Sequence, residues 1–279
     1  MKWRTAGMGA VLLGGVGMAG GVAAQERDDD FRWSAPMEAG RLLEVQGITG
    51  NIRAEAASGR TAEVMAVKTG RGGDFHEVEV RVVETRDGYR ICAVYHPHRN
   101  DDGDCDSEWH DDDRGWGRDR DADHRRSVDV EVDYVVKLPA GVDFEGTMVS
   151  GDIHIEDVRS EVEATTVSGD VYITTSEVAR ATTVSGSVEV AMGSTDWNDL
   201  DFQTVNGDIT LWLPRNIDAR VAFSSLSGDI DSDFDLGDQG RNRRQWVGRT
   251  VRGVIGEGGS RRLSLKTVSG DVRLKYASR

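Results

Sequence analysis

Apolar residues after residue 40 fall in short runs in which Val and Ile alternate with polar residues. This alternation has the two-residue period of a β-strand, and apolar stripes with a helical period are nearly absent. The chain holds 34 glycines and only 4 prolines among its 279 residues, which is typical of strands joined by glycine turns. The pattern therefore predicts an all-β protein.

One phrase returns along the C-terminal half, and at residues 165–173 it reads Thr-Thr-Val-Ser-Gly-Asp-Val-Tyr-Ile. The central glycines of six copies are Gly151, Gly169, Gly186, Gly207, Gly228 and Gly270. They are separated by 18, 17, 21, 21 and 42 residues, and because 42 is twice 21 we expect one degenerate or looped-out turn before the last copy. A period near 20 indicates a solenoid, since propeller blades need about 40–45 residues. We expect residues 141–279 to form a single-chain parallel β-helix.

The residue types of the phrase predict its structure. The apolar positions should point inward and form the core, and the columns are Val167, Val171 and Ile173, with Val149, Ile153 and Ile155, and Val205, Ile209 and Leu211. The glycines act as structural turns, because glycine adopts a positive φ while Ser, Asn and Asp side chains bond to nearby backbone amides.

The aspartates of successive copies should form a ladder, because stacked strands lie about 4.8 Å apart. Its members are Asp152, Asp170, Asp208, Asp229 and Asp271, with Ser187 as an interruption. We expect a solvated ladder. The alternative is a calcium site at Asp152 and Asp170, since calcium prefers oxygen ligands, although the period does not match the nine-residue calcium-binding solenoid repeat.

The N-terminus has the features of an export signal. Lys2 and Arg4 precede an apolar segment rich in small residues, and we expect cleavage after Ala24. The alternative is a membrane-spanning anchor, because the uncharged stretch approaches the roughly 20 residues that cross a bilayer. After cleavage we expect no integral membrane span, and the absence of a cysteine near residue 24 argues against a lipid anchor.

Residues 25–140 are predicted to form an N-terminal β region that caps the solenoid. Residues 45–52 resemble a diverged copy of the repeat, and Asp87-Gly88 is a hairpin turn signal. Further strands are expected at residues 62–67, 76–84, 89–95 and 128–138. A cap would protect the strand edges of the terminal coil from aggregation.

An acidic insertion at residues 99–127 breaks the strand pattern and should be a disordered loop. Cys92 and Cys105 are the only cysteines, and in an oxidising compartment we expect them to form a disulfide. Five acidic residues roughly imitate a calcium loop, but Ser107 stands where that loop needs glycine; they are Asp102, Asp104, Asp106, Glu108 and Asp113. Nearby histidines offer an alternative transition-metal site without a defined zinc spacing; they are His96, His98, His110 and His124.

Charge and motifs exclude several classes of function. The formal net charge is −15, so the chain should be repelled by nucleic acid and anionic lipid. No serine-nucleophile motif is evident, and we expect neither catalysis nor a cofactor. The alternative is a β-helix enzyme acting on acidic polysaccharides with Asp152 and Asp170 as acid and base, although coils of 17 to 21 residues leave little chain for a cleft.

The Ser-Gly-Asp phrases, together with Gly-Val-Ile-Gly-Glu-Gly-Gly at residues 253–259, resemble the bacterial family DUF4097 over roughly residues 40–277. The resemblance implies a right-handed β-helix-like fold, export in many members, and an adhesin label that rests mainly on shape. It supplies no catalytic residues.

The expected function is that of an exported adhesin or cell-envelope scaffold, in the periplasm or at the cell surface. Its partner would be an envelope or surface component, either protein or polysaccharide. Four outward-facing positions on the strands should contact it, namely Tyr172, Glu189, Thr210 and Arg273. A third hypothesis is a structural protein stabilised by calcium.

Overall fold

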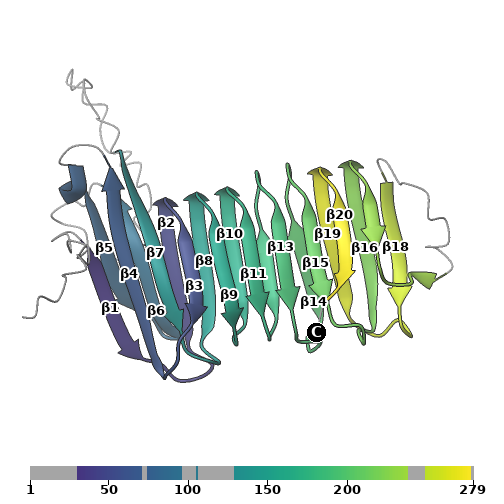
Figure 1. Cartoon of the computed structure of the whole chain (residues 1–279), viewed down its shortest axis with the longest axis horizontal. Helices are drawn as coiled ribbons and strands as arrows, with labels where there is room; N and C mark the ends of the chain where they lie inside the picture. The colour runs from purple at the N-terminus through teal and green to yellow at the C-terminus, as the bar shows by residue number, and fades with distance from the viewer. Residues whose placement is uncertain (1–29, 71–73, 96–104, 106–128, 238–248, 278–279) are drawn as a thin grey trace, which may run out of the picture.

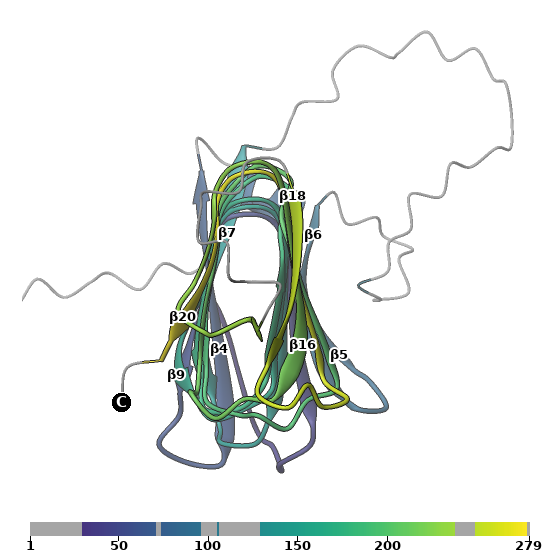
Figure 2. The ribbon, with the colours of Figure 1, turned by 90° about the vertical axis from the view of Figure 1, so that its right-hand side faces the viewer.

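The computed structural model describes residues 30–70, 74–95, 105, 129–237 and 249–277. Within these ranges the chain forms twenty strands and one short 3₁₀ helix, η1. The strands make two ten-stranded sheets, here named sheet A and sheet B, that face each other along the length of the molecule (Figure 1 and Figure 2). The prediction of an all-β protein is confirmed.

The order of strands shows how the chain is wound. Sheet A has the order β1-β4-β7-β3-β9-β11-β13-β15-β20-β17, and sheet B has the order β18-β16-β19-β14-β12-β10-β8-β2-β6-β5. The bounds are β1 Phe31–Pro36, β2 Leu42–Thr49, β3 Ile52–Ala56, β4 Thr61–Gly70, η1 Asp74–Glu77, β5 Val78–Glu84, β6 Gly88–Tyr95, β7 Val130–Leu138, β8 Asp143–Ser150, β9 Ile153–Val158, β10 Val162–Ser168, β11 Val171–Thr175, β12 Ala179–Thr182, β13 Val188–Met192, β14 Asp199–Gln203, β15 Ile209–Leu213, β16 Ala219–Ser227, β17 Ile230–Ser232, β18 Arg249–Ile255, β19 Arg262–Ser269 and β20 Val272–Tyr276.

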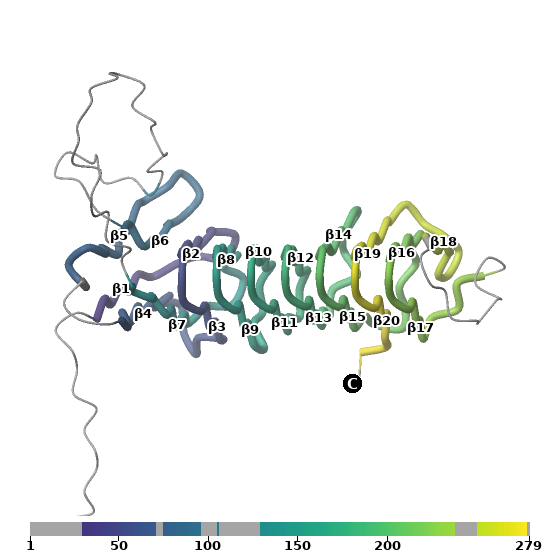
Figure 3. Tube along the Cα trace, turned by 90° about the horizontal axis from the view of Figure 1, so that it is seen from above, coloured from purple at the N-terminus to yellow at the C-terminus, as the bar shows by residue number. Residues whose placement is uncertain are grey.

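Each coil consists of one strand from each sheet. The chain runs along β8 in sheet B, bends at Gly151, and returns along β9 in sheet A; the next coil repeats this path with β10 and β11. Neighbouring coils pair in parallel, as in Val162 opposite Phe144 and Val171 opposite Ile153. Figure 2 looks along the stack and shows the two sheets as facing walls, and Figure 3 shows the succession of coils.

The parallel stack ends in antiparallel strands. At one end β1, β4 and β7 pair antiparallel in sheet A, and β5 pairs antiparallel with β6 in sheet B. At the other end β18 pairs antiparallel with β16. The β5–β6 hairpin confirms the turn predicted at Asp87-Gly88, and β2 with β3 confirms that residues 45–52 belong to a copy of the coil.

The coils do not stack in the order of the sequence. The last copy, β19 with β20, lies between β14 with β15 and β16 with β17 (Figure 1). Among the residues that the structure describes, no further coil lies between the copies at Gly228 and Gly270, so the degenerate turn is excluded and the looped-out alternative is left. The segment between these glycines includes β18, after which the chain re-enters the stack one position earlier.

The core lies between the two sheets and is filled by Val, Ile, Leu and Phe side chains, among them Val171 and Ile153. The prediction that Val149, Val167 and Val205 belong to it is wrong, because these side chains are 48%, 48% and 40% exposed. In sheet B the residue before each of these valines points inward, so the valine itself points outward. The three-residue bend that follows then starts a new alternation in sheet A. Val167 thus faces outward although Val171 faces inward.

Several predictions fall on residues outside the described ranges. They concern the export signal at residues 1–24 and most of the insertion at 99–127, including Asp102, Asp104, Asp106 and the four histidines. A disulfide does join Cys92 of β6 to Cys105, with 5.8 Å between their Cα atoms. In the described part of the chain, no helix has the length and apolar character needed to cross a membrane.

Candidate functional site

The glycine of the repeat is required by sterics. Gly169 has a φ of +153°, and a Cβ added to it would lie 2.1 Å from the carbonyl oxygen of Gly151 in the neighbouring coil. Gly186, Gly207, Gly228 and Gly270 show the same close approach, at 1.9–2.0 Å. A column of bare Cα atoms therefore lets the bends of successive coils stack.

The aspartates of the repeat form a ladder that bonds one coil to the next. Asp152 Oδ1 accepts the backbone N–H of Asp170 at 2.8 Å, and Asp170 Oδ1 accepts that of Ser187 at 2.7 Å. The same bond joins Asp208 to Asp271 and Asp271 to Asp229, both at 2.8 Å. The predicted ladder is present, and one oxygen of each of these carboxylates is bonded to a backbone amide.

A third column was missed by sequence reasoning. The hydroxyl of Thr166 donates to the carbonyl of Gly151 at 3.1 Å, and that of Thr183 donates to the carbonyl of Gly169 at 3.1 Å. These hydroxyls satisfy carbonyls that the bend would otherwise leave unbonded. The repeated Thr before Val was the available signal. All three columns give the Ser-Gly-Asp phrase a structural role.

The outer face of sheet A carries the four positions expected to contact a partner. Strand register places them in one row that also includes Arg53 and His154. In spatial order the row reads Arg53, His154, Tyr172, Glu189, Thr210, Arg273 and Asp231. We name this set the sheet A row. Thr210 is only 8% exposed and so contributes little surface, contrary to expectation.

Aromatic side chains mark the middle of this face. The rings of His154 and Tyr172 stack with centroids 4.6 Å apart and planes 21° apart. Trp212 lies partly exposed in the adjacent row, between Ala191 and Lys275. Sequence reasoning missed both His154 and Trp212, because neither recurs in other copies of the repeat.

Charges at the C-terminal end of the sheet A row compensate one another. Arg273 Nη1 donates to Asp208 Oδ2 at 2.9 Å, and this hydrogen bond is the main cause that raises the pKa of Arg273. Burial acts to raise the pKa of Asp208, but the Asp271 N–H and Arg273 outweigh it and lower that pKa. Lys275 similarly pairs with Asp231, which raises the pKa of the lysine.

The other end of the row holds a second ion-pair group. His154 Nε2 lies 2.8 Å from Glu156 Oε1, and Arg53 Nη2 lies 2.7 Å from Glu156 Oε2. The hydrogen bond with His154 lowers the pKa of Glu156, and the charge of Arg53 adds to this effect. The row therefore offers rings and hydrogen-bonding groups rather than a patch of one charge.

Sequence comparison identifies the family. The profile described as Toastrack DUF4097 matches residues 124–275, which is more than half of the chain. The chain belongs to the Toastrack DUF4097 family. The match begins just before β7, yet the structure stacks β2 and β3 of the N-terminal half into the same two sheets. The Toastrack fold is β-solenoid-like, in agreement with the two long sheets.

Solved structures with similarity to this Toastrack chain are distant. A "putative cell adhesion protein" from Clostridium sporogenes has 8% identity and a TM-score of 0.43, and the match covers 89% of this chain and 100% of that one. A "putative adhesin" from Bacteroides fragilis has 12% identity and a TM-score of 0.35, covering 89% and 98%. No curated protein matches the sequence. These scores carry no argument about function.

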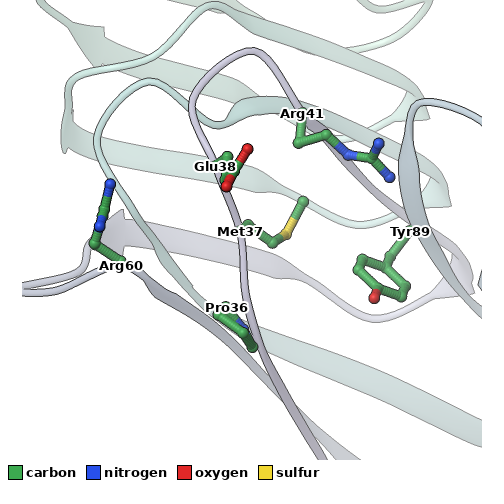
Figure 4. Close-up of a pocket in the computed structure, with 6 residues that line it drawn as sticks. All are labelled: Pro36, Met37, Glu38, Arg41, Arg60 and Tyr89. Atoms are coloured by element: carbon green, nitrogen blue, oxygen red, sulfur yellow. The ribbon is translucent and has the colours of Figure 1, made fainter.

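A shallow pocket of about 390 Å³ lies near the N-terminal end of the Toastrack chain (Figure 4). It is lined by Pro36, Met37, Glu38, Arg41, Arg60 and Tyr89. Tyr89 also packs edge-on against Trp33, with centroids 4.9 Å apart. The lining combines apolar side chains with charges of both signs.

The described ranges contain no group of three or more His, Cys, Asp or Glu side chains placed to hold a metal ion. Asp152 and Asp170 lie on adjacent coils as predicted, but each uses Oδ1 to bind the backbone of the next coil. The two residues are therefore brought together for a structural purpose that needs neither calcium nor catalysis.

Proposed function

We propose that the protein is an exported, non-catalytic adhesion or scaffold module of the cell envelope, and that it binds an extended envelope or surface component through the sheet A row. The observation that carries this proposal is the alignment of solvent-facing side chains across consecutive coils, which includes the stacked rings of His154 and Tyr172. Amphipathic rings supply large contact areas with little loss of side-chain entropy. A rigid, flat row suits an extended polymer.

Family membership supports this proposal, because Toastrack relatives carry an adhesin label and many are exported. The N-terminal segment with Lys2 and Arg4 before small apolar residues supports export by a cleaved signal. The disulfide between Cys92 and Cys105 agrees with an oxidising compartment, either the periplasm or the cell surface.

Two finer features of the fold belong to the same proposal. We expect the coil to be right-handed, as parallel crossover connections nearly always are. The strands β1, β4, β5 and β6 would act as the cap of the N-terminal end, because they cover the edge that β7 and β2 would otherwise expose. The chain would then comprise the signal at 1–24, the β region at 25–140 and the repeats at 141–279.

The experiment uses protein exported and processed by a bacterial host, applied to envelope fractions, whole cells and purified glycans. Saturable binding to one of these is expected. Tyr172→Ala should weaken it about tenfold, or roughly 1.4 kcal/mol, because it removes the stacked ring. Trp212→Ala should act in the same direction.

The matched control is Thr165→Ala, which changes a partly exposed side chain on the outer face of sheet B. It should bind as the wild type does. Absence of saturable binding to every fraction would refute adhesion, and equal losses in Tyr172→Ala and Thr165→Ala would refute the assignment of the row. Circular dichroism confirms that each variant keeps its strand content.

The geometry does not support the alternative function, that of a carbohydrate-active enzyme. Its two candidate carboxylates, Asp152 and Asp170, are consecutive rungs of a structural ladder in which Asn51 holds the equivalent position. An asparagine can accept the same amide hydrogen bond, but it cannot serve as an acid or base at that position. The hydrogen bonds between coils therefore explain the ladder without a catalytic role.

A further inference from the structure

The outer face of sheet B carries a straight column of exposed aliphatic side chains. Among the described residues, eight large hydrophobic side chains are exposed, and seven of them lie in this column. In spatial order they are Ile48, Val149, Val167, Val184, Val205, Val268 and Leu226, one from each of seven consecutive coils. We name this set the aliphatic stripe.

Strand register keeps the aliphatic stripe straight. The residue after each member aligns with its counterpart, as in Ser150 opposite Ser168 and Ser168 opposite Ser185. Backbone bonds join the members, with Val205 N donating to Val184 O at 3.1 Å. Seven strands span six intervals of roughly 4.8 Å, so the stripe is about 29 Å long. Its members are 40% to 70% exposed, with Leu226 the most exposed.

Exposed apolar patches of this regularity mark interaction surfaces. The columns on either side of the stripe are nearly uncharged: Ser, Asn or Thr on one side, and Thr, Gln and Ser with Lys266 on the other. Lys266 is itself paired with Asp201 at 3.1 Å. The net charge of −15 therefore does not prevent two copies from meeting along this line.

We propose that the aliphatic stripe is the interface of a symmetric dimer, in which two copies pack stripe against stripe in opposite directions. A second copy carries an aliphatic row with the same spacing between coils, so the branched side chains of one stripe can pack between those of the other along its whole length. A two-fold axis uses the same patch on both partners.

The distribution of charged residues along sheet B favours packing of the two stripes in opposite directions. The three strands at one end of the stripe, β2, β8 and β10, carry four acidic residues and no basic one; these are Glu44, Asp143, Glu145 and Glu163. The two strands at the other end, β19 and β16, carry three basic residues and no acidic one; these are Arg220, Arg262 and Lys266, of which the last two also lie beside Asp199 and Asp201 of β14. Opposed stripes bring the acidic end of each copy to the basic end of its partner, and stripes in the same direction would not.

The dimer would have a consequence for adhesion. Because the stripe lies on sheet B, the two sheet A rows would face away from each other. One dimer could then bind two surfaces or two chains of a polymer, which raises avidity when both rows are engaged. The dimer does not depend on the binding function proposed for sheet A, since it uses the other sheet.

Sedimentation equilibrium of the exported protein tests the dimer. The wild type should be dimeric, and the triple variant Val167→Thr, Val184→Thr and Val205→Thr should raise the dissociation constant roughly a hundredfold or more. Thr keeps the β-branched shape on exposed positions, so strand content and melting temperature should be retained. Val254→Thr is the matched control, because Val254 is 40% exposed on β18 outside the stripe.

Cysteine cross-linking tests the direction. Val184 is the central member of the stripe, so Val184→Cys should form a disulfide-linked dimer rapidly, whereas Val254→Cys should not. Val149→Cys should link to Val268→Cys in a mixture and poorly to itself. A monomeric wild type, or a triple variant that stays dimeric, would overturn the proposal; so would self-linking of Val149→Cys as fast as that of Val184→Cys. A monomeric wild type whose stripe variants lose envelope binding would assign the stripe to another partner.

Discussion

At the residue scale, the Ser-Gly-Asp bend shows how one residue type can be required by its neighbour in space. Gly169 lies so close to Gly151 of the next coil that no side chain fits between them. The backbone groups around the bend form hydrogen bonds with side chains of the repeat, namely Asp152 of the ladder, which accepts the N–H of Asp170, and the buried Thr166. Each bend therefore depends on the adjacent bend for its hydrogen bonds.

The first prediction concerns this contact. Gly169→Ala should destabilise the protein by roughly 3 kcal/mol, because the new Cβ meets a backbone oxygen and the residue keeps a strained positive φ. Chemical denaturation followed by circular dichroism measures the loss. Gly59→Ala is the control, since nothing lies within 4 Å of a Cβ at that position. Equal stability of the two variants would show that the bends can move apart at little cost.

At the element scale, the strands tolerate a charged row that the sequence did not reveal. Strand register places Glu44, Glu145 and Glu163 side by side on β2, β8 and β10. Burial is the main cause that raises the pKa of Glu145, and the two flanking glutamates raise it further, although Arg90 opposes them. Glu145 follows Glu44 by 101 positions (145 − 44) and precedes Glu163 by 18 (163 − 145). No local pattern in the sequence indicates that they pair, so only the stacking order brings them together.

The second prediction follows from that shift. Because the pKa of Glu145 is raised in the folded state, its ionised form lowers the free energy of unfolding at neutral pH. This loss of stability disappears as the pH falls through the raised pKa and then through the unfolded value near 4.5. Glu145→Gln should therefore stabilise the protein at pH 7 by about 0.5 kcal/mol and have no effect near pH 3.

Thermal unfolding at the two pH values measures the difference. Glu189→Gln serves as the control, because its neighbours in the sheet A row are Tyr172 and Thr210 rather than carboxylates. It should leave stability unchanged at both pH values. A gain for Glu145→Gln that persists near pH 3 would show that charge repulsion is not its cause.

At the scale of the whole molecule, the stack is nearly one-dimensional, since each coil contacts mainly the coils on either side. Removal of one complete coil should therefore leave a shorter but folded protein. Deletion of residues 165–181 joins Ala164 to Thr182, which occupies the position of Thr165 in the next copy. We expect a cooperative thermal transition at a lower temperature and a particle shorter by about 4.8 Å in small-angle scattering.

The control deletion differs by one residue. Removal of residues 165–180 joins Ala164 to Ala181, two buried positions that would then point to opposite sides of the strand. This variant should fail to fold or should aggregate. If both deletions behave alike, the coils are not interchangeable units.

Period-two alternation and the recurring glycine were enough to determine the all-β class, the coil as the unit of structure, the β5–β6 hairpin and the copy at residues 45–52. These features depend on residues close together in sequence, whose conformational preferences are local. The pairing of Cys92 with Cys105 also followed, because the chain has no other cysteines.

Only the tertiary structure decided which side of the bend each valine faces and where the last coil lies. Val167 and Val171 have the same parity in sequence, but the bend between the sheets separates an outward position from an inward one. The insertion of β19 and β20 before β16 and β17 depends on long-range pairing, for which similar repeats give many equivalent choices. The aliphatic stripe and the sheet A row arise from that stacking, so the surfaces that carry the proposed functions became visible only when the coils were in place.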